Sequence, residues 1–361
     1  MKKEICILGL GALVLFNGCA KTPDANGNFA VNETQNEEIK DTELYEENNV
    51  EWNIENSGEQ FHLQAVLPEN LKNVKLYNIQ MKLEENSMSA DEIWDMLVGE
   101  DIGYSDVTEQ TNKEIENQMK SEDTLEQTNN NQMVQNGVIP YTYLQSNDGE
   151  VMISWNNQDL TLTDEKLLKR IKNAEGSING EMDTAENVLK EKLAQLGLND
   201  ISIIKEENGG AEGQEIQFVP VVHQLPIAYE GITDINSPRI YGQINIVDGQ
   251  IAQLYLLNGF LKEETSEEQS SIITVEKLHN IMTQAIKDKR INICSEIVYT
   301  HLSLEYYPML ENGNIVLLPA WHIYLTSEEK EQISDEVWSE MQSNGIVPFN
   351  IYINAVTGDF L

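Results

Sequence analysis

The sequence predicts an α+β fold: tandem modules that each pack one helix on an antiparallel sheet, and an N-terminal α+β region before them. Two segments carry apolar residues at helical spacing, which gives each helix one apolar face. Other segments alternate apolar and polar residues with period two, as half-buried strands do. Both kinds of element recur in the same order in the second half of the chain, which indicates an internal repeat.

The first 18 residues have the layout of a secretion signal. Lys2 and Lys3 precede an apolar run from Ile5 to Phe16 that is interrupted only by small glycines and Cys6. A membrane-spanning helix needs about 20 apolar residues, and this run is shorter. We therefore expect residues 1–18 to be a cleaved signal peptide.

The residues before Cys19 predict how the mature chain is held. The stretch LFNGC, residues 15–19, resembles the lipobox of bacterial lipoproteins, although Phe16 stands where that family usually has leucine. The resemblance implies that Cys19 becomes the N-terminus and carries acyl chains on the extracytoplasmic face of a Gram-positive-type cell membrane. Each buried methylene contributes about 0.8 kcal/mol, so two chains give a stable anchor. The alternative is an ordinary signal peptide with a chance cysteine.

Composition excludes nucleic acid as a partner. The chain has 61 acidic and 23 basic residues and a formal net charge of -38, which repels phosphate backbones. Cys6 leaves with the signal and Cys19 is lipidated, so Cys294 has no partner for an intramolecular disulfide. Core burial must therefore supply the stability.

The region before the repeat divides into a tether and a folded part. Residues 19–50 are polar and without period, which predicts a lipidated, disordered tether. Residues 51–178 are predicted to form the N-terminal α+β region, with a polar insertion at 104–137 that forms an exposed loop or a mobile helix. Strands are expected at 61–67, 74–83, 139–144 and 151–155, and helices at 90–98, capped by Ser89, and 164–172, capped by Thr163.

Three matched motifs define the two modules, at 181–261 and 272–361. TAENVLKEKLAQL from Thr184 matches TVEKLHNIMTQAI from Thr274, IQFVPVVH (216–223) matches IVLLPAWH (315–322), and INIVDGQI (244–251) matches INAVTGDF (353–360). The spacing between copies grows along the chain, as two loop insertions in the second copy would produce.

Two prolines fall inside these strand patterns, Pro220 and Pro319. Because proline lacks the ladder N–H, we expect each at a bulge or a sheet edge. Such an edge could accept a strand from a partner protein, or it could simply be shielded.

A helix followed by a small antiparallel sheet ending in INIVDGQI or INAVTGDF resembles the PepSY-type domain and related accessory proteins of a Gram-positive sensor kinase. The resemblance covers residues 181–361. It implies an extracytoplasmic, non-catalytic protein that binds a protease or a sensor kinase. A lipobox in place of a transmembrane helix departs from the kinase accessory proteins.

No motif for catalysis, a metal or a cofactor is present, so we predict no catalytic residues, no metal site, no cofactor and no enzyme activity. None of the five histidines lies in H-E-x-x-H, and one mature free thiol allows no Cys/His zinc spacing. His223 and His322 hold matching positions in the two modules. They could form a paired metal site, or each could satisfy a neighbouring polar group.

The second module contains an acidic insertion at 326–348 that the first lacks. It is predicted to be helical, with apolar residues on one face that are candidates for partner binding: Ile333, Val337, Trp338 and Met341. The same residues could instead pack onto their own domain.

Together these features predict a membrane-anchored extracytoplasmic lipoprotein that is a regulatory or scaffolding protein-binding module. Its expected partners are the membrane, through the lipid, and an extracytoplasmic protein. The alternative is a solute-binding lipoprotein for a sugar or peptide, since five tryptophans and thirteen tyrosines could line a cleft. A hydrolase would need clustered carboxylates or a histidine pair in a deep cleft.

Overall fold

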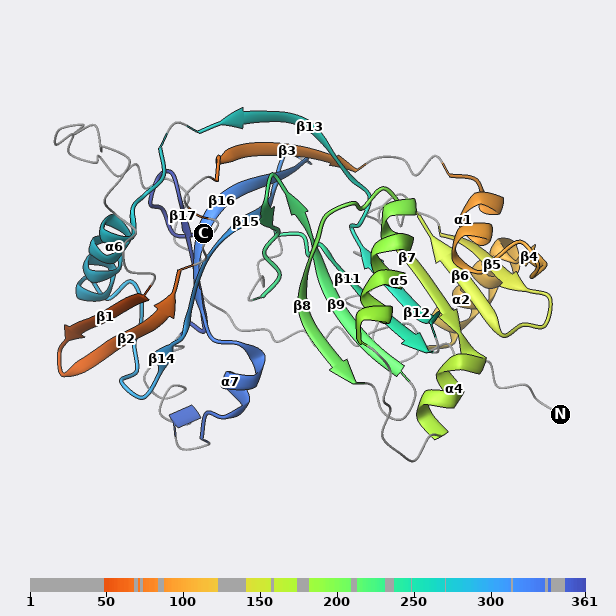
Figure 1. Cartoon of the computed structure of the whole chain (residues 1–361), viewed down its shortest axis with the longest axis horizontal. Helices are drawn as coiled ribbons and strands as arrows, with labels where there is room; N and C mark the ends of the chain where they lie inside the picture. The colour runs from red at the N-terminus through yellow and green to blue at the C-terminus, as the bar shows by residue number, and fades with distance from the viewer. Residues whose placement is uncertain are drawn as a thin grey trace. The chain divides into compact units, whose positions relative to one another are not determined.

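In the computed structural model the described residues form three β-sheets (Figure 1). Their buried apolar side chains make two large hydrophobic cores. The α+β class with largely antiparallel sheets is confirmed. All described residues belong to one unit, Tyr45–Leu361. The structure describes residues 49–67, 71, 74–83, 88–122, 141–156, 159–173, 182–208, 213–230, 237–247, 249–269, 271–312, 314–334, 337–338 and 348–361.

The largest sheet has nine strands in the order β10-β9-β11-β12-β7-β6-β5-β4, with β8 on the other side of β9. Its strands are β4 (Tyr104–Asp106), β5 (Thr142–Ser146), β6 (Val151–Trp155), β7 (Leu160–Asp164), β8 (Ile201–Asn208), β9 (Gly213–Val222), β10 (Leu225–Pro226), β11 (Tyr241–Val247) and β12 (Gln250–Leu257).

One face of this sheet is aliphatic because every strand places alternate residues there. The register aligns one residue from each of six strands in a buried row: Leu144, Ile153, Leu162, Leu254, Ile244 and Ile216. Helices α1 (Ala90–Leu97) and α5 (Met182–Gln195) contribute Trp94 and Leu189 to the same core, called the α5 core below. The predicted cap of α1 is confirmed, since Ser89 and Glu92 form a reciprocal capping box.

The remaining strands form two smaller sheets. One has the order β13-β3-β16-β15 with β17 also beside β16, and the other has the order β1-β2-β14. Their strands are β1 (Asn49–Asn56), β2 (Glu59–Val66), β3 (Tyr77–Leu83), β13 (Leu261–Glu268), β14 (Val298–Tyr299), β15 (His301–Glu311), β16 (Asn314–Tyr324) and β17 (Asn350–Asn354).

Helix α6 (Val275–Lys287) buries its apolar stripe against these two sheets. Leu278 and Met282 join Phe61, Trp321 and Ile353 in one cluster, called the α6 core below. Trp321 also donates from Nε1 to the carbonyl of Ile273 at 2.9 Å. The other described helices are α2 (Thr108–Glu122), α4 (Glu165–Asn173) and α7 (Ser327–Glu331).

The strands of residues 51–178 are shared between the two cores. Strands β1 to β3 contribute to the α6 core, and β3 pairs with β16. Strands β5 to β7 contribute to the α5 core, and β7 pairs with β12. The hydrophobic cores therefore do not follow the predicted boundary near residue 178, because hydrogen-bonded pairs join this region to strands far along the chain.

Several local predictions hold and one cap differs. Strand β6 has the predicted bounds, and β2 and α1 differ from theirs by one or two residues. The polar insertion forms β4 and then α2, and residues 123–137 lie outside the described part. The prediction that Thr163 caps α4 is wrong: Thr163 lies in β7, and the N–H of Leu167 donates to Asp164 Oδ1 at 2.9 Å.

The two predicted modules share an order of elements: α5-β8-β9-β11 and α6-β15-β16-β17, with each strand antiparallel to the next. Their registers differ. Ile216 pairs with Ile244, whereas Trp321, not Ile315, pairs with Ile353, a difference of six residues. The strand motif and the hairpin motif therefore cannot both mark structurally equivalent positions.

Pro220 and Pro319 lie inside internal strands, so their expected place at a bulge or an edge is wrong. Each sits where one neighbouring strand ends and another begins: β3 ends beside Leu317 and β17 begins beside Ala320. On the side of β16 that faces β3 and β17, the carbonyl of Pro319 accepts from Ala355 N at 2.8 Å. The N–H that proline lacks would point to the same side, between the end of β3 and the start of β17. Neither proline marks an open edge for a partner's strand.

Candidate functional site

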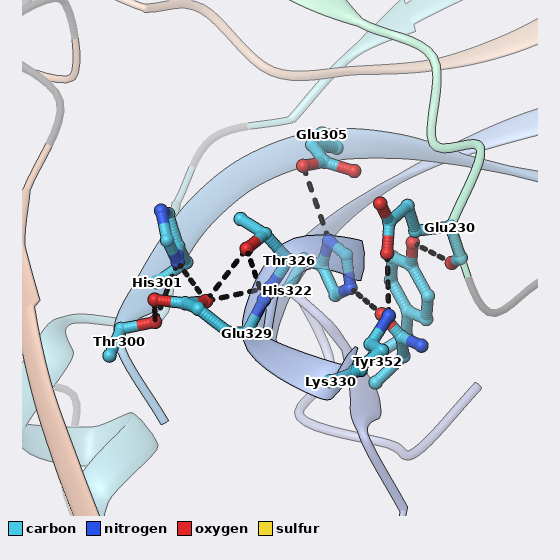
Figure 2. A network of polar contacts seen from close by, with 10 residues as sticks. Glu230, Thr300, His301, Glu305, His322, Thr326, Glu329, Lys330 and Tyr352 are labelled. Carbon is cyan, nitrogen blue, oxygen red and sulfur yellow. Dashed lines mark hydrogen bonds and ion pairs between the residues drawn. The ribbon is translucent and has the colours of Figure 1, made fainter. Parts of the chain in front are cut away.

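A group of titratable, hydrogen-bonded side chains lies on the face of β15, β16 and β17 that points away from the α6 core. Trp321 and Ile323 of β16 point into that core, so His322 and Tyr324 point to the opposite face. Figure 2 shows the resulting network, which also takes in the start of α7 and the segment after β10. We call it the His322 cluster.

His322 lies inside a column of five aromatic rings. Its ring stacks between Tyr324 and Tyr352, with centroid distances of 4.1 and 4.0 Å and interplanar angles of 16° and 13°. His301 extends the column beyond Tyr324 at 4.9 Å, and Tyr307 extends it beyond Tyr352 at 4.8 Å. This stacking leaves His322 only 1% exposed.

Both ring nitrogens of His322 have polar partners. Nδ1 lies 3.2 Å from Glu305 Oε1, and Nε2 lies 3.0 Å from Asn350 Oδ1. Ser303, which faces His322 across the strand pair, donates from Oγ to Glu305 Oε1 at 2.5 Å. The three strands therefore hold the imidazole in one orientation.

Glu305 is ionised within this largely buried group. Burial acts to raise the pKa of Glu305, but the charge and hydrogen bond of His322 and the Ser303 hydroxyl outweigh it and hold the pKa below its usual 4.5. The side chain of Glu305 is 13% exposed and that of His322 is 2% exposed. The contact between the two side chains is therefore largely shielded from solvent.

A second histidine and glutamate tie α7 to the same sheet. Glu329 forms a reciprocal capping box with Thr326 at the start of α7, and it accepts from Thr300 Oγ1 at 2.7 Å. Its Oε2 also lies 3.5 Å from His301 Nδ1. Burial acts to raise the pKa of Glu329, and these hydrogen-bond donors outweigh it, so the pKa is lowered.

A third contact brings in the segment after β10. Lys330 Nζ lies 2.6 Å from Glu230 Oε2, and the hydroxyl of Tyr352 donates to the Glu230 carbonyl at 2.6 Å. Burial, followed by the charge of Glu305, raises the pKa of Tyr352, so this hydroxyl stays protonated as a donor. The cluster thus joins five segments of the chain.

The geometry suits a structural clamp. A general base has to reach a substrate proton, and His322 is enclosed with both nitrogens engaged. Within the described residues, no three His, Cys, Asp or Glu side chains lie close enough together to hold a metal ion.

The two histidines at matching motif positions lie in different settings. His223, in the turn after β9, contacts Glu263 Oε2 at 2.8 Å and stacks on Tyr77 at 4.4 Å. His322 contacts Glu305. Each thus has its own carboxylate and its own tyrosine neighbours.

The candidate residues of the 326–348 insertion are only partly brought together. Ile333 and Val337 are partly buried against the α6 core. Trp338 remains 37% exposed, with its ring edge-on to Phe349 at 5.1 Å. Met341 and the lipidation residue Cys19 lie outside the described residues.

The sequence contained a signal for the His322 cluster that motif searches do not detect. His301, Ser303, Glu305 and Tyr307 alternate along β15 with the apolar residues that face the core. A period-two polar row normally marks a solvated sheet face, so the pattern alone does not predict burial.

Comparisons with known proteins do not assign a family. No protein-family model matches the sequence, and no curated protein matches it. A crystal structure of an uncharacterized protein from Eubacterium rectale is similar over 87% of this chain and 93% of that chain, with 11% sequence identity and a TM-score of 0.49.

Proposed function

We propose that this chain is an extracytoplasmic lipoprotein, anchored to the cell membrane through Cys19, and that its folded part is a non-catalytic protein-binding module with a regulatory or scaffolding role. The closed geometry of the His322 cluster carries the non-catalytic part of this proposal. His322 and Glu305 at its centre hold three strands together and are largely shielded from solvent.

The anchoring part rests on the sequence before residue 20. Two lysines, a short apolar run and Gly18-Cys19 together fit a processed lipoprotein signal. None of the helices in the described ranges is both long enough and apolar enough to cross a bilayer.

Trp338 is the residue that we expect to contact the partner. Ile333 and Val337 pack against the α6 core and hold this segment in place, while the indole of Trp338 remains partly exposed. Exposed tryptophans supported by packed neighbours are frequent hot spots of protein interfaces. The insertion thus combines its two expected roles: Ile333 and Val337 pack onto their own domain, and Trp338 is available to contact a partner.

A photo-crosslinking amino acid at position 338, introduced into the full chain in living cells, tests the partner. We expect a discrete adduct with one extracytoplasmic protein, and a Trp338→Ala chain should recover that protein at least about tenfold less well. The same crosslinker at Leu310, which is 44% exposed on β15, is the matched control and should give no such adduct. Identical adducts at both positions, or none at 338, would contradict the proposal.

A second candidate function, binding of a solute such as a sugar, is favoured by a row of uncharged polar side chains on the outward face of the nine-stranded sheet.

A further inference from the structure

The outward face of the nine-stranded sheet carries an unbroken row of uncharged polar side chains. The register aligns one residue from each of six strands: Tyr143, Ser154, Thr161, Tyr255, Gln243 and Gln217. All six are partly buried. With strands about 4.8 Å apart, the row spans about 24 Å.

A second, largely polar row runs beside the first. It leads from Gln145 through Met152, Thr163, Gln253 and Asn245 to Glu215, so it contains one apolar and one charged residue. Helix α4 packs on Val247 just beyond this row, and Tyr241 lies at the other end of β11. The two rows, called the neutral face below, therefore lie between a helix and a tyrosine.

Apart from Glu215, the two rows are uncharged, which is unusual for this chain. The whole molecule has a net charge of -38. Strand β13 of another sheet shows how the chain builds a solvated strand, since its exposed residues include Lys262, Glu263, Glu264, Glu267 and Glu268. Charged side chains like those of β13 would keep a sheet face solvated equally well. The need for solvation therefore does not explain why the side chains of the neutral face are uncharged.

The side chains of the neutral face keep hydrogen-bonding capacity. Ser154 Oγ and Thr161 Oγ1 lie 2.6 Å apart, and Asn245 Nδ2 donates to Gln253 Oε1 at 3.0 Å. A hydroxyl group can take part in three hydrogen bonds and a side-chain amide in four. These contacts therefore use only part of the hydrogen-bonding capacity of the four side chains. A bound molecule rich in hydroxyls could use the remainder.

Tyrosine rings form one end of the neutral face. Tyr241 lies 5.7 Å from Tyr255 and 4.7 Å from Tyr229. Burial raises the pKa of Tyr241 to about 12 and also raises that of Tyr255, so both hydroxyls stay neutral donors. Partly buried tyrosines offer a rigid apolar body and a polar tip to a ligand.

The chemistry of the neutral face selects among ligand classes. Neither row contains a lysine or arginine, and Lys205 of β8 lies opposite Gln217 at one end. A phosphorylated or sulfated polymer would need cations along the whole length of the face. The two rows also form no apolar groove for an acyl chain or an amphipathic helix. Aromatic rings beside amides and hydroxyls suit a ligand with apolar C–H faces and many neutral hydroxyls.

We propose that the neutral face binds a neutral oligosaccharide, with Tyr255 as a ring on which a sugar stacks and Thr161 and Gln243 as hydrogen-bonding partners. The inference rests on the solute-binding candidate function and is independent of a protein partner at Trp338.

Isothermal titration of the purified full chain in detergent micelles tests the proposal. The probes are maltohexaose, cellohexaose, mannohexaose and chitohexaose, with hexagalacturonate as an anionic counterpart. We expect at least one neutral probe to bind with a Kd that does not change with salt, and we expect no binding of hexagalacturonate. Tyr255→Ala should weaken binding about tenfold, the equivalent of about 1.4 kcal/mol.

Two further variants separate binding from folding. Thr161→Val keeps the shape of the side chain and removes its hydroxyl, and it should weaken binding several-fold. Tyr77→Ala removes a partly buried tyrosine of β3, outside the neutral face, and should leave the Kd unchanged.

The proposal is overturned if no neutral probe binds at millimolar concentration, or if Tyr77→Ala weakens binding as much as Tyr255→Ala. Self-association that Tyr255→Ala abolishes would also overturn it, because the face would then bind a second copy of the chain. Loss of the crosslink at position 338 would leave these titrations unaffected, so the two proposals fail separately.

Discussion

At the scale of single residues, alternation along a strand places His322 on a polar face, and the surrounding rings then bury it. Trp94 and Trp321 lie among apolar residues of an amphipathic helix and of a strand, and both are buried, at 1% and 0% exposure. The sequence did not predict the contacts of His322, because those come from strands whose pairing no local pattern specifies. Burial of a hydrophobic residue can be predicted from its own side chain. Burial of a histidine cannot, because it requires hydrogen-bonding partners such as Glu305.

Glu305 provides a pH-dependent test of the clamp. Its folded pKa lies below the ordinary 4.5, so the folded state binds protons less readily than the unfolded state. The stabilisation is therefore complete above the unfolded pKa and is lost as pH falls through the folded pKa. Glu305→Gln should lower the free energy of unfolding at pH 7 by about 1–3 kcal/mol.

Urea unfolding between pH 7 and pH 3 measures this effect. The difference between wild type and Glu305→Gln should shrink as the pH falls into the acidic range. Glu311→Gln, at the exposed end of the same strand, should show no comparable loss at pH 7. A constant difference across this range would mean that the charge of Glu305 does not stabilise the fold.

At the scale of elements, the sequence predicted the helices with strong caps and missed strands that lack a clear period. The capping box of Ser89 marked α1 correctly. Strand β13, with its run of exposed Glu and Lys, has no apolar alternation and was not predicted. It is a strand because β3 pairs with it, which is a tertiary influence on a sequence with little intrinsic strand preference.

The pair Gly242 and Phe218 tests how β9 and β11 fit together. The two residues lie opposite each other, and a Cβ on Gly242 would come within 2.1 Å of the fully buried Phe218 ring. Gly242→Ala should therefore destabilise the protein by about 1–3 kcal/mol through overpacking, measured by chemical denaturation. At Gly103 a Cβ would meet only the side-chain end of Asn147. Gly103→Ala should cost clearly less, and equal losses would contradict this packing.

At the scale of the whole molecule, the sequence predicted the α+β class but did not predict which strands share a sheet. Strand β7 pairs with β12, and β3 pairs with β16, across long stretches of chain. Such pairing depends on complementary faces and edges rather than on local propensity. The neutral face was not predicted because it depends on this pairing: its first row takes one residue from each of six strands.

Anchoring of this folded part through Cys19 is the central claim, and mass spectrometry of the chain purified from membranes of its own host tests it most directly. The account predicts an N-terminal peptide that begins at Cys19 and carries diacylglycerol on the sulfur, and it predicts that Cys19→Ser abolishes both processing and membrane retention. An intact peptide that joins Gly18 to an unmodified Cys19, from a chain recovered in the cytosol or the medium, would contradict it.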